Sequence, residues 1–469
     1  MGIKKAALIN AAGKYLKVIL SVIINAVLAR ILSADDYGIV AIITVFSTLF
    51  ATLSDIGFGA AIVQRKDLTD EDINQVYSLS VYVSVVLAVA FIIISYPIAW
   101  FYGNDVFISL GIILSISVFF NALNMVPNGI LNREKKFVVI AVRLVVVYLI
   151  TAIITIFLAK AGLRYYALAL ESVLTALFTF IWNFIKTRPK FRWKIKKESI
   201  NKILSYSGFQ FAFNIVNYFS RNLDHLLTGK ILGSAELGYY SKSYTLMLYP
   251  VNNLTGAISP VLHPLLSDYQ NQKQIIYERY CKIVRFLACI GIYVTFVCYL
   301  GSKEIINILY GSQWAESVVC FQLLSIAIIP QMINSSMGAI FQSLGNTKLL
   351  FQNCCINTTI TVIGILLGVF VGKSIESLSI FVAAAYVIHF LTASFMLMVK
   401  GFKYKIFDFY KQLLPETIMI LLMIPAVYLY PFSISGNILS LIVKGAYLGV
   451  IYLALLLITK EYRIFKMLF

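Results

Sequence analysis

Six polar side chains recur on one face of a predicted membrane helix, where they could bind a polar ligand. The set, spaced by four, three, four, three and four positions, consists of Gln210, Asn214, Asn217, Arg221, Asp224 and Thr228. These intervals follow one face of an α-helix, and His225 lies beside that face. Polar groups at membrane depth are costly unless they face a bundle interior or a water-filled cavity. We therefore expect this face to line a cavity.

A second polar stripe lies near the N-terminus, and its members are Asn10, Lys14, Lys17, Ser21 and Asn25. Its first four positions coincide with those of the first stripe at a shift of 200 residues. Two equivalent helices with matching polar faces are expected to face each other across one cavity. Two alternatives remain open. Arg221 and Asp224 could neutralise each other at a spacing of three, and Lys14 and Lys17 could extend to the cytoplasmic surface.

Charged residues within other predicted spans add to this cavity. They are Arg143, Glu171, Lys242 and Lys444, of which Lys444 lies near the C-terminus and is expected to be peripheral. With Arg221, they leave an excess of positive charge inside the membrane. Because Arg and Lys bind phosphate strongly, the sequence predicts an anionic ligand.

Two asparagines complete the predicted binding residues. Asn253 and Asn334 are suited to sugar hydroxyls, and hydrogen bonds between helices are the more common use of such residues in a membrane. If transport is coupled to a proton or sodium ion, the candidate residues are Asp224, His225 and Glu171.

Signatures of catalysis are missing from the sequence. It contains no Walker motif, no GxSxG, no HExxH and no DxD in an aqueous loop. The six cysteines form no CxxC or His-paired pattern, which is typical of small apolar residues. We therefore predict no enzyme, no catalytic residue, no metal site and no cofactor.

Composition identifies the elements that must position these residues. Of the 469 residues, 60% are hydrophobic and 13% are charged, about half the charged share of a soluble domain. This excludes soluble, disordered and disulfide-rich secreted proteins. The net charge of +18 would suggest nucleic acid in a soluble chain. In a membrane protein it reflects Lys and Arg collected in cytoplasmic loops, so no nucleic-acid partner is predicted.

Apolar stretches of span length predict an all-α integral membrane protein with fourteen transmembrane helices. They lie near 8–32, 38–63, 75–101, 105–131, 138–160, 163–186, 203–231, 237–265, 281–300, 316–342, 349–371, 376–399, 413–430 and 438–459. With the N-terminus inside, Lys and Arg concentrate in every cytoplasmic loop, so both termini are predicted to be cytoplasmic.

An internal repeat divides the chain. ARILSADDYG (Ala29–Gly38) matches GKILGSAELG (Gly229–Gly238), and Leu114-Ser115-Ile116 matches Leu324-Ser325-Ile326 at a shift of 210. Two pseudo-symmetric six-helix lobes around a central cavity follow, related by an axis along the membrane normal. The predicted organisation is an N-lobe at 1–186, a basic cytoplasmic linker at 187–202, a C-lobe at 203–400, and two further helices within 401–469.

The residues resemble a known family. The resemblance rests on FSRNLDHLLTGKILGSAELGYYSKSY (Phe219–Tyr244), on KYLKVILSVIINAVLARILSADDYGIVAI near the N-terminus, and on LSDIGFGAAIVQRKDLT. These stretches resemble the Wzx-type polysaccharide flippases, of the polysaccharide transporter branch of the multidrug/oligosaccharidyl-lipid/polysaccharide exporter superfamily. The N-x-D-x-x-x-x-G-K-x-L-G-x-x-x-L-G-Y-Y pattern from Asn222 to Tyr240 is the most specific element.

That resemblance implies a multi-pass protein of the bacterial inner membrane. Such a protein moves an undecaprenyl-pyrophosphate-linked oligosaccharide to the periplasmic leaflet by alternating access of its two lobes, for capsule, exopolysaccharide or lipopolysaccharide assembly. The implied partners are the lipid-linked substrate, membrane lipids, and the polysaccharide polymerase and export machinery.

Three alternatives were weighed against this function. A drug or cation antiporter of the same superfamily needs buried carboxylates, whereas the N-terminal stripe holds lysines. A lipid II flippase shares the fold and the lipid anchor, and charge alone does not distinguish it. A membrane glycosyltransferase needs a sizeable loop with acids or arginines at the membrane surface, which the sequence lacks.

Overall fold

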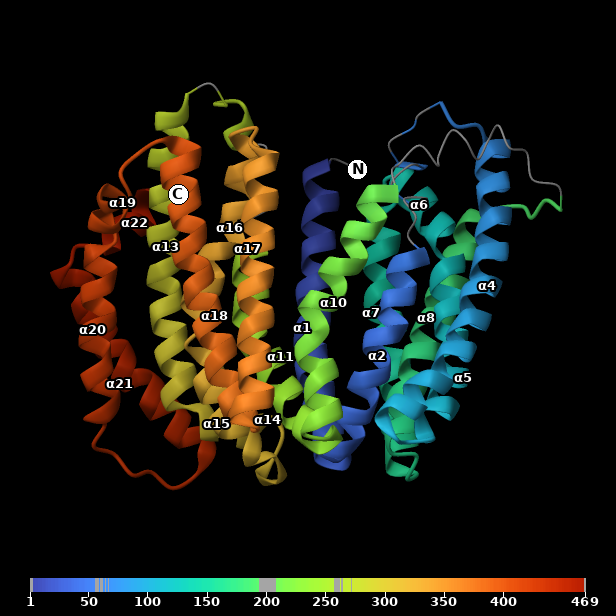
Figure 1. Ribbon diagram of the computed structural model, residues 1–469, viewed down its shortest axis with the longest axis horizontal. Helices are drawn as coiled ribbons and strands as arrows, with labels where there is room; N and C mark the ends of the chain where they lie inside the picture. The colour runs from blue at the N-terminus through green and yellow to red at the C-terminus, as the bar shows by residue number, and fades with distance from the viewer. Residues whose placement is uncertain are drawn as a thin grey trace. The chain divides into compact units, whose positions relative to one another are not determined.

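The computed structural model describes residues 3–54, 59, 62–63, 65, 67–193, 208–256, 262, 265–270 and 272–467, with side chains left aside at 3–11, 208–217, 220 and 466–467 (Figure 1). This part of the chain is helical, as the composition predicts. It divides into two compact units, Met1–Gly238 and Tyr239–Phe469. The first unit thus contains the helix that carries the Arg221 stripe, and the two predicted lobes remain a prediction.

In the described residues, the first unit contains eight helices and the first residues of a ninth. They are α1 (Ile3–Ile31), α2 (Ala34–Ser54), α4 (Asp70–Tyr102), α5 (Val106–Leu123), α6 (Met125–Arg133), α7 (Phe137–Lys160), α8 (Tyr165–Thr187), α10 (Gly208–Ile231) and the start of α11 (Ser234–Thr255). Local sequence sets their ends. In α4, Thr69 and Asp72 form a reciprocal capping box, and Gly103 ends the helix at φ +69°.

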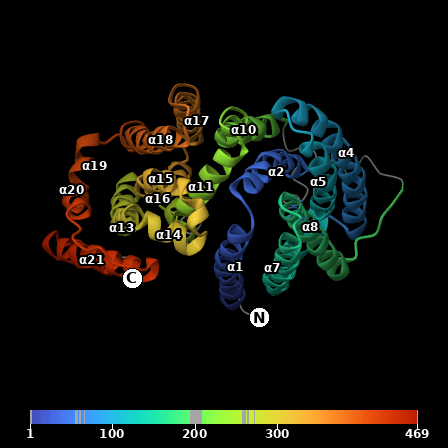
Figure 2. The ribbon, with the colours of Figure 1, turned by 90° about the horizontal axis from the view of Figure 1, so that it is seen from below.

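The helices of the first unit pack one against the next in a row. Helix α1 packs on α7, α7 on α8, α8 on α5, α5 on α2, and α2 on α10. Helices α1 and α10, which carry the two predicted stripes, therefore lie at the two ends of this row (Figure 2). The basic segment after α8 lies along the start of α4, where the Lys190 and Arg192 amides donate to Asn74 and Ser78. Residues 194–202 of this predicted linker are outside the described part.

The second unit contains the rest of α11 and all later helices. These are α13 (Lys273–Leu300), α14 (Ser302–Leu309), η1 (Ser312–Trp314), α15 (Glu316–Ser325), α16 (Ile328–Ser343), α17 (Thr347–Leu366), η2 (Leu367–Gly372), α18 (Ile375–Phe395), η3 (Met396–Phe402), α19 (Ile406–Gln412), α20 (Leu414–Tyr428), α21 (Asn437–Ile458) and α22 (Tyr462–Met467). Cys289, Phe296, Met419, Met423 and Leu448 belong to one apolar core. The last two long helices, α20 and α21, are thereby attached to α13.

Helix boundaries repeat along the chain with the intervals expected from the sequence. Helix α11 begins 200 positions after α2, and α10 ends 200 positions after α1. Helices α15, α17 and α18 each begin 210 positions after α5, α7 and α8. The short matches in the sequence therefore mark a repeat of whole elements.

Two glycines of the repeated motif explain why it recurs. A Cβ at Gly38 would lie 1.7 Å from the Ser234 carbonyl oxygen, and a Cβ at Gly238 would lie 1.9 Å from the Ala34 carbonyl oxygen. The pairs 34 with 238 and 38 with 234 exchange under the 200-residue shift, so the starts of α2 and α11 contact each other reciprocally. Glycine at both positions lets the two backbones approach closely.

The fourteen predicted spans are partly matched. Ten helices of the described residues are long and apolar enough to cross a membrane. Two bent pairs, α15 with α16 at 51° and α19 with α20 at 55°, raise this number to twelve. The predicted spans at 203–231 and 237–265 fall on α10 and α11, whose polar residues lower their mean hydropathy. The count of fourteen stays a prediction, whereas the all-helical membrane architecture is confirmed.

Candidate functional site

A buried arginine surrounded by amides is the most unusual polar site of the first unit. Arg143, on α7, is 9% exposed. Its Nη1 donates to Asn183 Oδ1 at 2.6 Å and to Asn128 Oδ1 at 3.1 Å. Asn183 in turn donates from Nδ2 to Asn124 Oδ1 at 2.8 Å. Helices α6, α7 and α8, together with the break between α5 and α6, thus contribute to one connected network.

The break between α5 and α6 positions this network. Helix α5 ends at Leu123 and α6 begins at Met125, so Asn124 occupies the junction. Asn128 follows one turn later on α6, and Asn183 reaches the site from α8. Amide side chains can accept from Arg143 and still donate to one another, because each carries both a carbonyl oxygen and an NH₂ group.

Charge is the important property of this site. Arginine remains protonated in proteins, and in the described residues no carboxylate pairs with Arg143. Amides solvate the guanidinium but do not neutralise it. Since buried charges are normally paired, the site retains a positive charge that an anionic group can neutralise.

The N-terminal stripe is partly accessible. Lys14 is exposed, and Lys17 is half-buried with its Nζ 5.6 Å from the centre of the Tyr148 ring on α7. Ser21 donates to the Val18 carbonyl, and Asn25 donates to the Ser21 carbonyl, both within α1. These two lysines therefore provide the accessible positive charge of this stripe.

The second stripe falls partly within the described residues. Asp224 is buried, and its Oδ1 lies 3.0 Å from Nδ1 of His225 and accepts the His225 backbone N–H at 2.8 Å. Arg221 is exposed. Asp224 thus contacts His225. The sequence left open a mutual neutralisation of Arg221 and Asp224, but no ion pair joins these two residues in the described part of the chain. Asn214 and Asn217 lie on α10, but their side chains fall outside the described part.

Other predicted residues lie apart from Arg143. Glu171 is half-buried on α8. In the second unit, Lys242 is buried with its Nζ 5.4 Å from the centre of the Tyr310 ring, and Asn253 donates to the Tyr249 carbonyl. Asn334 has a buried Oδ1 without a hydrogen-bond partner among the described residues. The thirteen predicted cavity residues are divided between the two units, and their common cavity stays a prediction.

Several polar residues were missed by the sequence reasoning. Asn183 is a single amide in an apolar helix. Asn128 belongs to a series of asparagines with the spacing of one helix face, which the sequence reasoning did not use: Asn121, Asn124, Asn128 and Asn132. Glu304, which binds Lys444 at 2.6 Å, and the buried Glu416 and Glu461 were also missed. Glu304 and Glu461 lie outside the predicted spans, and Glu416 lies at the very start of the span predicted at 413–430, where carboxylates are common.

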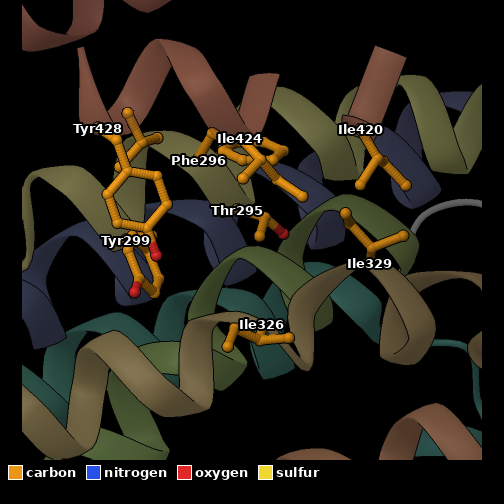
Figure 3. Close-up of a pocket in the computed structure, with 9 residues that line it drawn as sticks. Thr295, Phe296, Tyr299, Ile326, Ile329, Ile420, Ile424 and Tyr428 are labelled. Carbon is orange, nitrogen blue, oxygen red and sulfur yellow. The ribbon is translucent and has the colours of Figure 1, made fainter. Parts of the chain in front are cut away.

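An apolar pocket of about 270 Å³ lies in the second unit between α13, α20 and the bend from α15 to α16 (Figure 3). Its polar groups are few, and its lining consists of Thr295, Phe296, Tyr299, Ile326, Ile329, Ile420, Ile424, Val427 and Tyr428. Such a surface suits hydrocarbon and does not suit sugar.

Comparison with known proteins identifies the family of this chain. A family model described as "Polysaccharide biosynthesis protein" matches residues 27–319. An uncharacterized membrane protein of the cps region of Klebsiella pneumoniae is 26% identical over 69% of this chain and 67% of its own length. The teichuronic acid biosynthesis protein TuaB of Bacillus subtilis is 24% identical over 65% of this chain and 64% of its own length.

Among solved structures, the lipid II flippase MurJ in an inward closed conformation has a TM-score of 0.75 at 16% identity, over 97% of this chain and 99% of the other. At this identity the likeness establishes the fold. The chain therefore shares its fold with that structure.

Proposed function

The chain belongs to the polysaccharide biosynthesis protein family, and on that premise we propose that it is a flippase for a lipid-linked oligosaccharide. The cargo is an undecaprenyl-pyrophosphate-linked repeat unit, which the protein carries from the cytoplasmic to the periplasmic leaflet of the bacterial inner membrane. Relatives from Klebsiella pneumoniae and Bacillus subtilis, whose names refer to a cps region and to teichuronic acid biosynthesis, support this cargo class.

The observation that carries the proposal is the buried, uncompensated charge of Arg143. A pyrophosphate carries the negative charge that this site lacks, and Arg binds phosphate oxygens with charge-assisted hydrogen bonds. Lys14 and Lys17, on the helix that packs against α7, add positive charge on the same unit. This arrangement favours an anionic headgroup over a cationic drug.

The rest of the cargo requires two further environments. Amides such as Asn334 and Gln331, both with buried unpartnered atoms among the described residues, are suited to sugar hydroxyls. The apolar pocket beside α20 suits part of the lipid chain. Alternating access of two lobes then exposes the headgroup to each side in turn, while the hydrocarbon stays in the bilayer. In this proposal both termini are cytoplasmic, and the polymerase and export machinery receive the product.

A leaflet-resolved assay of lipid-linked oligosaccharide tests the proposal in cells that lack the gene. Wild-type protein should restore the periplasmic pool, and Arg143→Gln should reduce it at least tenfold at equal membrane abundance. The matched control is Arg279→Gln, which removes an exposed arginine on α13 and should restore the pool fully. Restoration by Arg143→Gln at the wild-type level would contradict the proposal.

The alternative cargo, lipid II, is distinguished by the same cells. The fold similarity to a lipid II flippase makes it the second candidate. If the chain rescues a strain depleted of lipid II flippase activity but leaves the oligosaccharide pool unchanged, lipid II replaces the proposed cargo.

A further inference from the structure

The joint between α13 and the C-terminal helices contains a second charged site, distant in sequence from the predicted stripes. Arg285 Nε donates to Glu416 Oε1 at 3.0 Å, and Arg285 Nη2 donates to Glu461 Oε1. Both glutamate side chains are 3% exposed, whereas that of Arg285 is 27% exposed. One guanidinium therefore bridges two buried carboxyl groups.

Charge balance makes this site exceptional among the buried acids of the described residues. The others are Asp36, Asp72, Asp224 and Glu304. Asp36 pairs with Arg164, Asp72 caps α4, Asp224 contacts His225, and Glu304 binds Lys444. Each has its own cation or donor set, but Glu416 and Glu461 share a single cation. If both were ionised, the site would hold one buried negative charge in excess.

Two carboxylate oxygens that accept no hydrogen bond within the described part of the chain show where this excess negative charge would lie. Oε2 of Glu416 and Oε2 of Glu461 are both buried without a hydrogen-bond partner among the described residues. The thiol of Cys289 is also buried, and its Sγ lies within 4.8 Å of an oxygen of each carboxyl. One oxygen of each carboxyl and the Cys289 Sγ thus lie within 4.8 Å of one another, beside the guanidinium of Arg285. A buried unpaired charge or acceptor is costly, so the geometry requires a neutralising partner there.

Local features of the backbone place the two glutamates at this site. Glu416 lies in the first turn of α20, next to Pro415 at the helix start. Glu461 follows Lys460, whose φ of +62° turns the chain back after α21. The site lies at the edge of the apolar core that joins α13, α20 and α21, where Tyr452 donates to the Cys289 carbonyl.

We propose that Glu416 and Glu461 together bind one exchangeable proton, with Arg285 fixing the pair so that the protonated site is neutral. The proton is held by a carboxyl Oε2, and its exchange adds or removes one charge at the attachment of the C-terminal helices. The guanidinium of Arg285 and the thiol of Cys289, both on α13, are the ionisable groups beside it, and Lys282, Lys460 and Arg463 are exposed cations close in sequence to Arg285 and Glu461. A metal ion is disfavoured because the guanidinium already contacts both carboxylates and repels a second cation.

Infrared difference spectroscopy on the full-length protein in nanodiscs tests the proposal, because a protonated carboxyl has a C=O stretch that a carboxylate lacks. At pH 7 the wild type should show the band of one buried protonated carboxyl, and the band should disappear as the pH rises. Glu416→Gln and Glu461→Gln should each abolish it, since the remaining glutamate forms a neutral pair with Arg285.

Two further variants make the result decisive. Glu278→Gln removes an exposed carboxyl on the same helix and should leave the band intact. Arg285→Met removes the shared cation and should double the band, because both acids then become neutral. The proposal is overturned if the wild type lacks the band at pH 5 and pH 7, or if the band survives in both single glutamine variants. Each variant is checked for a monodisperse profile, and the wild-type titration stands by itself if a variant fails to fold.

Discussion

Close contact between the starts of α2 and α11 yields the sharpest stability prediction. Alanine at position 38 would place its Cβ 1.7 Å from the Ser234 carbonyl oxygen and 2.5 Å from the carbonyl carbon. These are backbone atoms that no rotamer change can move. The helices must therefore separate by well over 1 Å before the contact reaches an ordinary van der Waals distance of 3.4–4 Å.

The size of the effect follows from this geometry. Overpacking costs about 1–3 kcal/mol where side chains can adjust, and here only backbone can yield, so we expect a loss of about 3 kcal/mol for Gly38→Ala. Gly238→Ala, 1.9 Å from the Ala34 carbonyl oxygen, should cost about the same. Because the two contacts are reciprocal, separation caused by one variant makes room for the other, and the double variant should cost less than the sum.

Thermal or denaturant unfolding of the purified variants measures this prediction. The matched control is Gly338→Ala, whose added Cβ meets nothing within 4 Å inside α16. It should be neutral or gain up to about 1 kcal/mol from helix propensity. Equal stability of Gly38→Ala and Gly338→Ala would refute the close contact, and strictly additive losses in the double variant would refute its reciprocity.

Three other predictions concern charge and topology. Arg221→Ala should abolish polymer export while the protein still reaches the membrane; normal export would remove this exposed residue from the mechanism. Lys444→Met leaves Glu304 buried without its cation and should cost about 3 kcal/mol in unfolding experiments at pH 7. Burial acts to raise the pKa of Glu304, but the hydrogen bond and charge of Lys444 hold that pKa below its ordinary value. The contribution of this pair should therefore be full at neutral pH and disappear only below about pH 4, and a loss already at pH 6 would contradict it. Single cysteines at Lys194 and Gly436, introduced after the native cysteines are replaced, should label from opposite sides of the membrane, and labelling of both from the periplasm would break the predicted topology.

The sequence pattern was sufficient to predict an all-helical membrane protein, because few backbone structures can satisfy their hydrogen bonds inside a membrane. Apolar length alone predicts spanning helices, and the repeat at shifts of 200 and 210 was visible in short matches such as Ala29–Gly38 with Gly229–Gly238. The structure adds the reason for these matches, since Gly38 and Gly238 make a contact in which no side chain fits. Because this contact is made by backbone atoms, it constrains the glycines and few other side chains, so the two copies of the repeat share little other sequence identity.

The candidate site was predictable where polarity followed helical spacing or where a charge interrupted an apolar run, as at Arg143. Asn183 was missed because a lone amide has no periodic signal. Asn128 was missed although it lies in a series of asparagines at helical spacing, because only the tertiary fold shows that this series meets Arg143. Glu416 and Glu461 were missed for a related reason: each lies at a helix end, where carboxylates are common, and their meeting at Arg285 depends on contacts more than 130 positions apart in sequence.

The most direct test of the central claim is transfer of a purified undecaprenyl-pyrophosphate-linked oligosaccharide between the leaflets of proteoliposomes that contain this protein alone. Wild-type protein and Arg279→Gln should move the lipid to the opposite leaflet, where an added glycosidase or lectin detects the glycan, and Arg143→Gln should slow transfer at least tenfold. Transfer no faster than in protein-free vesicles, or wild-type transfer by Arg143→Gln, would contradict an oligosaccharide flippase whose buried arginine neutralises the pyrophosphate.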